Sequence, residues 1–175
     1  LKKYKEYIHI CCTSEDINNL SYALMVKTGQ GLILNKLSNL NALIKKYTKK
    51  YSKNIMLSHT HGQPATPTSM GKEFLNFYAR LTLLQKKIKD LSVMGKFNGA
   101  TGNYSAHSIT FPNINWPAIN KKFINSLGIE ENKYTTQIEP HDYICEMSNN
   151  IAHVNSILIG FSQDMWSYIS KNYFI

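Results

Sequence analysis

Apolar residues recur every three or four positions in three long stretches of the chain, which is the spacing of one face of an α-helix. The first stretch contains Ile33, Leu34, Leu37, Leu40, Ile44, Tyr47 and Tyr51. The second contains Met70, Phe74, Phe77, Tyr78, Leu81, Leu84, Ile88 and Leu91. The third contains Tyr143, Met147, Ile151, Val154, Leu158, Phe161, Met165 and Ile169. The pattern predicts three helices of roughly 25–30 residues, well above the usual mean of about 11–12.

Residues that favour helix ends mark the limits of these stretches. Thr66 followed by Pro67 fits an N-cap and a first helical position. Pro140 fits the start of the last helix, because proline is tolerated in a first turn. Gly95 follows the second stretch and predicts its C-terminal end.

Two shorter helices and one irregular region complete the predicted elements. Helical spacing indicates short helices over about 16–27 and 117–127, the latter ended by Gly128. Residues 95–117 hold several glycines, asparagines and prolines and predict a structured loop or a small hairpin. Long helices with short connections predict an all-α fold, an elongated bundle. Because the apolar stripes hold many large side chains, part of their surface is expected to bury a partner subunit.

Composition limits the class of protein. Apolar residues make up 43% of the 175 residues, enough for a sizeable core, and no apolar run approaches the roughly 20 residues of a membrane span. The formal net charge of +9 suits an anionic partner. Arg80 is the single arginine, which argues against specific DNA readout. The cysteines, Cys11, Cys12 and Cys145, form no disulfide framework and predict a reducing compartment, the cytoplasm.

The first polar cluster that interrupts the helical pattern covers residues 13–19. Thr13 or Ser14 suits a helix N-cap, and Glu15 and Asp16 favour the positive end of the helix dipole. Capping alone accounts for these residue types. Hydroxyls and free backbone N–H groups at a helix start also form a ready anion site, and the two interpretations are compatible.

The second cluster covers residues 57–67 and contains two histidines, His59 and His61. Histidines two residues apart can ligate a metal from one face of a strand, but nothing else in the sequence completes a zinc site, and no metal or cofactor is predicted. A histidine is more often a hydrogen-bonded structural group than a catalyst. The density of polar groups between two long helices favours catalysis here, and imidazole is the natural acid or base near neutral pH.

The third cluster covers residues 134–143. It can simply be a loop with an N-cap that leads into the last helix, and capping is the favoured role of Asp142. Gln137 has an amide that both donates and accepts, which suits the edge of a purine. Glu139 and His141, with Asp142, are an alternative acid–base set.

Three segments, in this order, resemble the adenylosuccinate lyase family of the fumarase/aspartase superfamily. They are residues 13–19 (TSEDINN), 60–67 (THGQPATP) and 135–143 (TTQIEPHDY). The first two match broad superfamily motifs. The third, with residues 96–100 (KFNGA) and 102–104 (GNY), is similar to the bacterial type of the family in particular. The resemblance extends from about His9 to Tyr173.

The resemblance implies an activity and a role for each cluster. Enzymes of this family cleave adenylosuccinate to AMP and fumarate, and the succinylated carboxamide ribotide to its carboxamide and fumarate, by β-elimination in purine biosynthesis. His61 is expected to be the general acid that protonates the leaving nitrogen, with Thr60 on the succinyl part. Thr13 and Ser14 are expected to bind substrate carboxylate or nearby polar groups of the substrate, and Gln137 is expected to bind the nucleotide side.

The sequence also departs from the family pattern. The family's base is a serine on a mobile loop of the type GSSxMPxKxNP, and this segment does not occur here. The arginines that hold the phosphate and an upstream His-Asp segment do not occur either. We therefore expect residues 1–175 to be one piece from the middle of the enzyme, mostly its central helical bundle, and inactive alone.

The resemblance implies a homotetramer whose active sites are each assembled from three subunits around the long helices. It implies no nucleic-acid or membrane partner. Two alternatives stay open: another lyase of the superfamily, such as argininosuccinate lyase, and a non-enzymatic basic helical module that binds nucleic acid. Residues 135–143 favour the adenylosuccinate lyase pattern over the first alternative. The second explains the charge of +9 but not the polar cluster around His61.

Overall fold

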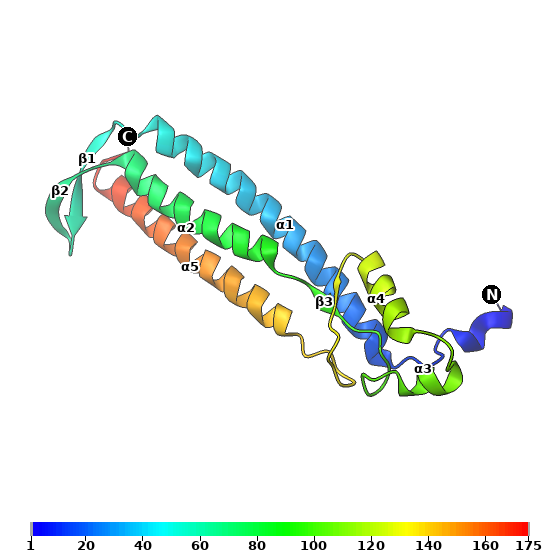
Figure 1. Cartoon of the computed structure of the whole chain (residues 1–175). Helices are drawn as coiled ribbons and strands as arrows, with labels where there is room; N and C mark the ends of the chain where they lie inside the picture. Colours follow the sequence, from blue (N-terminus) through cyan, green and yellow to red (C-terminus); the bar gives the residue numbers. More distant parts are fainter. Residues whose placement is uncertain (1, 175) are drawn as a thin grey trace. The chain divides into compact units, whose positions relative to one another are not determined.

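The computed structural model describes residues 2–174 and is mostly helical, which confirms the predicted fold class (Figure 1). The helices are α1 (Ser14–Lys50), α2 (Met70–Asp90), α3 (Ser105–Thr110), α4 (Trp116–Ser126) and α5 (Asp142–Ser170), preceded by a 3-10 helix, Lys2–Tyr7. The strands are β1 (Ile55–Thr60), β2 (Gln63–Ser69), β3 (Met94–Gly95) and β4 (Glu130–Glu131). None of the helices described is long and apolar enough to cross a membrane.

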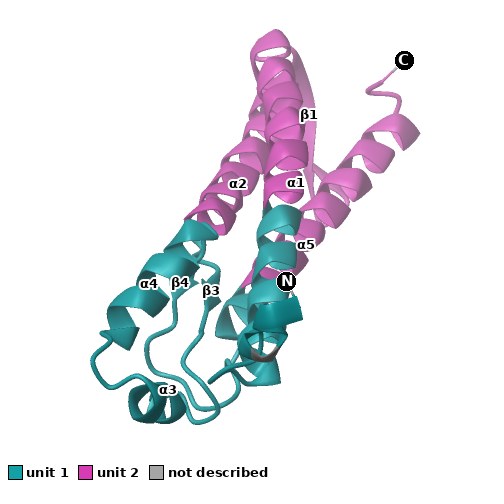
Figure 2. Cartoon of the chain, turned by 90° about the vertical axis from the view of Figure 1, so that its right-hand side faces the viewer, with its two compact units in different colours: residues 1–30, 91–146 teal, residues 31–90, 147–175 magenta. Residues whose placement is uncertain are grey.

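The chain divides into two compact units (Figure 2). Unit 1 holds residues 1–30 and 91–146, and unit 2 holds residues 31–90 and 147–175. Helices α1 and α5 contribute residues to both units. That the chain is a single piece of a central bundle stays a prediction.

Unit 2 is built from the later part of α1, from α2 and from most of α5, with the antiparallel β1–β2 hairpin (Figure 2). The helices meet through aromatic side chains: the rings of Tyr47 and Phe74 lie 5.6 Å apart, and those of Phe77 and Phe161 lie 5.0 Å apart. Its buried apolar side chains belong largely to the three predicted stripes. They are Leu37, Ile44, Met70, Phe74, Phe77, Leu81, Leu84, Ile88, Met147, Val154 and Ile157.

Unit 1 packs the start of α1 against α4 and the loops on either side of it. Its buried apolar core contains Leu20, Ala23, Val93, Ile124, Ile129 and Tyr143. Strands β3 and β4 pair in parallel, so the loop after α2 lies beside the segment after α4. Gly95 lies in β3, where an added Cβ would come within 2.7 Å of Leu20 Cδ2. A larger residue here would displace the Leu20 side chain, so the glycine serves packing in β3 and does not end α2, which ends at Asp90.

The sequence predicts two separate helices here, one over about 16–27 and one whose apolar stripe begins at Ile33, and this is wrong. The structure has a single helix of 37 residues, α1, which continues through Gly29 and Gly31. A glycine inside a helix costs about 1 kcal/mol relative to alanine. Ala23 before the glycines and Leu37 after them are both buried, and burial on both sides outweighs that cost.

The starts of two helices and the irregular region also differ from the prediction. Thr66 and Pro67 lie in β2, and α2 begins at Met70, where the Ser69 hydroxyl accepts a hydrogen bond from Lys72 N. Residues 95–117 hold the short helix α3 and no hairpin, because β3 pairs with β4. Helix α5 begins at Asp142, two residues after Pro140.

Two helical glycines of unit 2 give a matched test of the packing. A Cβ on Gly71 would lie 2.5 Å from Thr48 O, whereas nothing lies within 4 Å of a Cβ on Gly31. We expect Gly71→Ala to lower the free energy of unfolding by roughly 1–3 kcal/mol through overpacking. We expect Gly31→Ala to raise it by about 0.5–1 kcal/mol through reduced backbone entropy of the unfolded chain. Chemical denaturation measures both, and equal effects of the two changes would contradict the packing described.

Candidate active site

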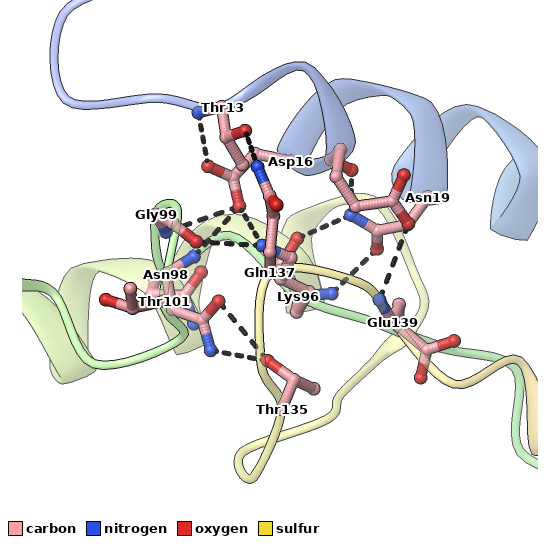
Figure 3. Close-up of polar contacts among 12 residues, drawn as sticks. Thr13, Asp16, Asn19, Lys96, Asn98, Gly99, Thr101, Thr135, Gln137 and Glu139 are labelled. Atoms are coloured by element: carbon pink, nitrogen blue, oxygen red, sulfur yellow. Dashed lines mark hydrogen bonds and ion pairs between the residues drawn. The ribbon is translucent and has the colours of Figure 1, made fainter.

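A buried carboxylate, that of Asp16, organises the polar cluster of unit 1 (Figure 3). Asp16 is the third residue of α1, and its side chain is 0% exposed. One oxygen, Oδ2, accepts a hydrogen bond from the backbone N of Thr13 at 2.9 Å, a capping arrangement. The other oxygen, Oδ1, lies 2.9 Å from Lys96 Nζ. The same oxygen accepts from the backbone N atoms of Asn98 and Gly99 at 3.2 and 3.3 Å.

The partner of this carboxylate, Lys96, is equally buried, and its backbone is held as well. Its ammonium group donates to Gly99 O at 3.0 Å. The side-chain amide of Asn19 accepts from Lys96 N at 2.8 Å and donates to Lys96 O at 3.0 Å. Segment 96–99 therefore has a fixed position on the first turns of α1.

Two of the predicted binding residues meet above this cluster. Gln137 Nε2 donates to Thr13 Oγ1 at 3.1 Å, across 124 positions of sequence (Figure 3). Thr13 immediately precedes α1, and Ser14 is its exposed first residue. Gln137 is also exposed, and its contact with Thr13 uses the amide nitrogen rather than the amide oxygen. The structure brings the first and third polar clusters of the sequence together.

The loop that carries Gln137 is fixed at both ends. On one side, Asn98 Nδ2 donates to Thr135 Oγ1 at 2.9 Å. Gly102, with φ +74°, lies so close to this loop that an added Cβ would come within 2.1 Å of Thr135 O. The φ angle and this close approach both require glycine at position 102, and the two loops therefore lie in direct contact here.

On the other side, the 1% exposed Glu139 accepts from Asn132 Nδ2 and from His141 N, both at 2.7 Å. The His141 ring lies between two carboxylates, with Nδ1 3.1 Å from Glu139 Oε2 and Nε2 3.7 Å from Glu15 Oε1. These groups join the end of the Gln137 loop to the start of α1. Asp142 is the exposed first residue of α5, where a carboxylate favours the helix dipole.

The remaining predicted residues, Thr60 and His61, belong to unit 2. Thr60 ends β1, and His61 with Gly62 forms the two-residue turn of the hairpin, with φ angles of 53° and 75°. Two positive φ angles are typical of a type I′ turn. His61 is exposed at this turn, whereas the half-buried ring of His59 lies 6.4 Å from that of Tyr173.

A polar cavity of about 400 Å³ lies beside the hairpin, within unit 2. It is lined by residues of β1, β2, α2 and α5, among them Thr60, Glu73 and Asp164. Burial, and then the charge of Glu73, raise the pKa of Asp164. Across residues 2–174, no group of three or more His, Cys, Asp or Glu side chains could hold a metal ion.

Sequence reasoning missed the group that supports the site, namely Asn19, Lys96 and Asn98. Lys96 and Asn98 belong to a motif of the family resemblance, residues 96–100, which assigns them no role. Polar residues in a loop have no periodicity that would reveal burial. The available signal was a lysine and an Asn-Gly pair in a segment where the apolar pattern stops.

Comparison with known proteins identifies the family of this chain. A family model described as "Lyase" matches residues 1–174. The chain belongs to this lyase family. Adenylosuccinate lyases from Buchnera aphidicola (of Schizaphis graminum) and from Escherichia coli K12 are 50% and 47% identical to it, each over 175 residues and 99% of the chain. The chain spans 38% of the length of each of these relatives.

Two solved structures share the fold of this chain. A fumarate lyase from Mesorhizobium sp. BNC1 matches with a TM-score of 0.83 at 18% identity, over 94% of this chain and 38% of that one. A 3-carboxy-cis,cis-muconate lactonizing enzyme from Pseudomonas putida matches with a TM-score of 0.80 at 20% identity, over 94% of this chain and 36% of that one. At such identities, the likeness concerns the fold alone.

Tyr143, at the start of α5, gives a test of the site's electrostatics. Its side chain is 4% exposed, and its hydroxyl has no hydrogen-bond partner within residues 2–174. Burial, and then Glu139 and Glu15, raise the pKa of Tyr143 from 10.0 to about 12. The unfolded chain therefore loses this proton first, and the free energy of unfolding falls as the pH rises from 10.0 to about 12.

We expect Tyr143→Phe to leave the stability at pH 8 unchanged or slightly raised, because it removes an unpaired hydroxyl. It should also reduce the loss of stability at alkaline pH. Denaturant titrations at a series of pH values measure both effects, with Tyr134→Phe, at an 84% exposed side chain, as the control. A Tyr143→Phe protein with the same alkaline loss as the control would contradict the burial of this phenol.

Proposed function

We propose that the intact protein containing this chain is an adenylosuccinate lyase that acts in purine biosynthesis. It eliminates fumarate from adenylosuccinate to give AMP, and from the succinylated carboxamide ribotide to give its carboxamide. The observation that carries this proposal is the identity of 47–51% to adenylosuccinate lyases over nearly the whole chain. The contact between Thr13 and Gln137 supports it further, because two of the three motif segments meet there.

The β-elimination needs three chemical contributions. A base takes the proton from the carbon beside a carboxylate, and hydrogen-bond donors stabilise the negative charge that develops. The C–N bond then breaks, and an acid protonates the nitrogen that leaves. We assign the acid to His61. Its exposed position at the hairpin turn supports this role, because a substrate can reach the imidazole.

The other predicted residues take binding roles. Thr60 lies next to His61 and would contact the succinyl part of the substrate. Thr13 and Ser14 offer hydroxyls at the start of α1, where the helix dipole favours a carboxylate. Gln137 would bind the nucleotide through the amide oxygen that its bond to Thr13 leaves open. No cofactor or metal takes part in this proposal.

We also propose a homotetramer with active sites shared between subunits, in the cytoplasm. Unit 2 exposes large apolar side chains, among them Leu83, Ile159, Trp166 and Ile169, which are 58%, 60%, 71% and 58% exposed. Exposed apolar surface of this kind favours burial against another subunit. Within residues 2–174 the cysteines form no disulfide, which supports a reducing compartment.

Assembly is tested by a charge placed on this surface. We expect sedimentation of the intact wild-type protein to show a tetramer at micromolar concentration, and Trp166→Glu to shift it toward smaller species. His153→Glu, at an exposed polar position of the same helix, is the control and should leave the assembly intact. A wild-type protein that sediments as a monomer would contradict the proposed assembly.

The two histidines of the hairpin test the chemistry. We expect His61→Ala to lower turnover of adenylosuccinate by about 10²–10⁴-fold, the usual contribution of a positioned acid, while the fold and substrate binding persist. His59→Ala should have a much milder effect on the chemical step, because the His59 ring packs on Tyr173. The assay is the absorbance change on fumarate release, with a thermal melt of each variant. Near-normal turnover of His61→Ala, or loss of turnover in His59→Ala alone, would show that a residue other than His61 is the general acid.

A further inference from the structure

We propose that the buried Lys96–Asp16 ion pair is a positioning pair that fixes Thr13 and Gln137 for substrate binding. This inference rests on the proposed function and deepens it. Neither charged group reaches solvent, since both side chains are 0% exposed. They act through the residues that they hold.

The first connection runs through Asp16 to Thr13. The carboxylate accepts from Thr13 N through Oδ2 while its other oxygen, Oδ1, is paired with Lys96. This bond sets the backbone of Thr13, and hence the direction of the hydroxyl that receives the amide of Gln137. A shift of the carboxylate would move that hydroxyl.

The second connection runs from Lys96 to the Gln137 loop. Lys96 Nζ donates to Gly99 O, and Asp16 accepts from the N atoms of Asn98 and Gly99, so the pair defines the backbone of this segment. Asn98 then donates to Thr135, two residues before Gln137. The same pair therefore supports both partners of the Thr13–Gln137 hydrogen bond.

Asp16 and Lys96 differ in the number of hydrogen-bond partners that each would keep if the other were replaced. This difference decides which residue to change. Without Lys96, the carboxylate of Asp16 keeps three backbone N–H donors, from Thr13, Asn98 and Gly99. Without Asp16, the ammonium group keeps only Gly99 O among the contacts described. A buried charge without a partner is strongly destabilising, so Lys96→Met is the milder change. Methionine also replaces the unbranched stem of the lysine as far as Cε, without its charge.

The experiment compares Lys96→Met and the double variant Asp16→Asn/Lys96→Met with Asn41→Ala, all in the intact protein. Asn41 is 5% exposed and donates to Gln85 Oε1 at 2.6 Å within unit 2, so this control removes a buried polar bond that does not touch Thr13 or Gln137. We expect Lys96→Met to raise KM for adenylosuccinate, and Kd for AMP, by about three- to tenfold, the effect of one weakened hydrogen bond. The value of kcat should change less.

Two further measurements separate positioning from general destabilisation. Gln137→Ala added to Lys96→Met should raise KM by less than it does in the wild type, because the second change removes a contact that the first has already displaced. Hydrogen exchange should rise in peptides that cover residues 11–19 and 132–141 of Lys96→Met. The control Asn41→Ala should melt earlier, with KM and these exchange rates unchanged.

The possible outcomes are distinct. If the wild-type protein does not cleave adenylosuccinate, the proposed function fails, and the exchange measurements still test the positioning. If the wild type is active and Lys96→Met keeps the wild-type KM and AMP affinity, the inference is overturned. It is also overturned if Asn41→Ala raises KM and exchange to the same extent. If Lys96→Met does not fold, the double variant, which removes both charges, takes its place with the same expected rise in KM.

Discussion

A carboxylate withdrawn from water must find donors in the protein, and Asp16 finds four. Three are backbone N–H groups, from Thr13, Asn98 and Gly99, and the fourth is the ammonium of Lys96. These donors come from two parts of the sequence about 80 residues apart, so that satisfying one charge fixes the start of α1 against the loop after α2. The exposed Gln137 loop then builds on this support through Asn98 and Thr135.

The helices were predictable from the sequence because an apolar stripe has a period, and its residues are the ones that become buried. Phe74, Phe77 and Leu81 are 5% exposed or less, as their spacing indicates. The boundaries were less predictable, because tertiary pairing overrides local preference. Thr66 and Pro67 have the residue types of a helix start, but they lie in a strand that pairs with β1. The continuity of α1 through Gly29 and Gly31 likewise depends on packing that the local sequence does not show.

The candidate site was predictable in part. Thr13, Ser14, Thr60, His61 and Gln137 were selected from motifs, and the contact of Thr13 with Gln137 agrees with a common site for these two. Their roles in binding and catalysis stay predictions. Lys96 was not predicted as a support, because a lysine is usually exposed and only the folded structure shows its partner. A contact that spans 124 positions of sequence likewise has no local signal.

The turn of the β1–β2 hairpin has a consequence for the variation that this chain can tolerate. His61 has a φ of 53°, in the left-handed region where glycine or asparagine is the usual choice for the first position of such a turn. Replacing His61 by asparagine would suit the backbone at least as well, so the stability of the hairpin does not require an imidazole there. Selection for stability alone would allow histidine to drift toward asparagine or glycine. If histidine persists at this position among closely related chains, its retention would indicate selection for the imidazole side chain itself rather than for the stability of the fold.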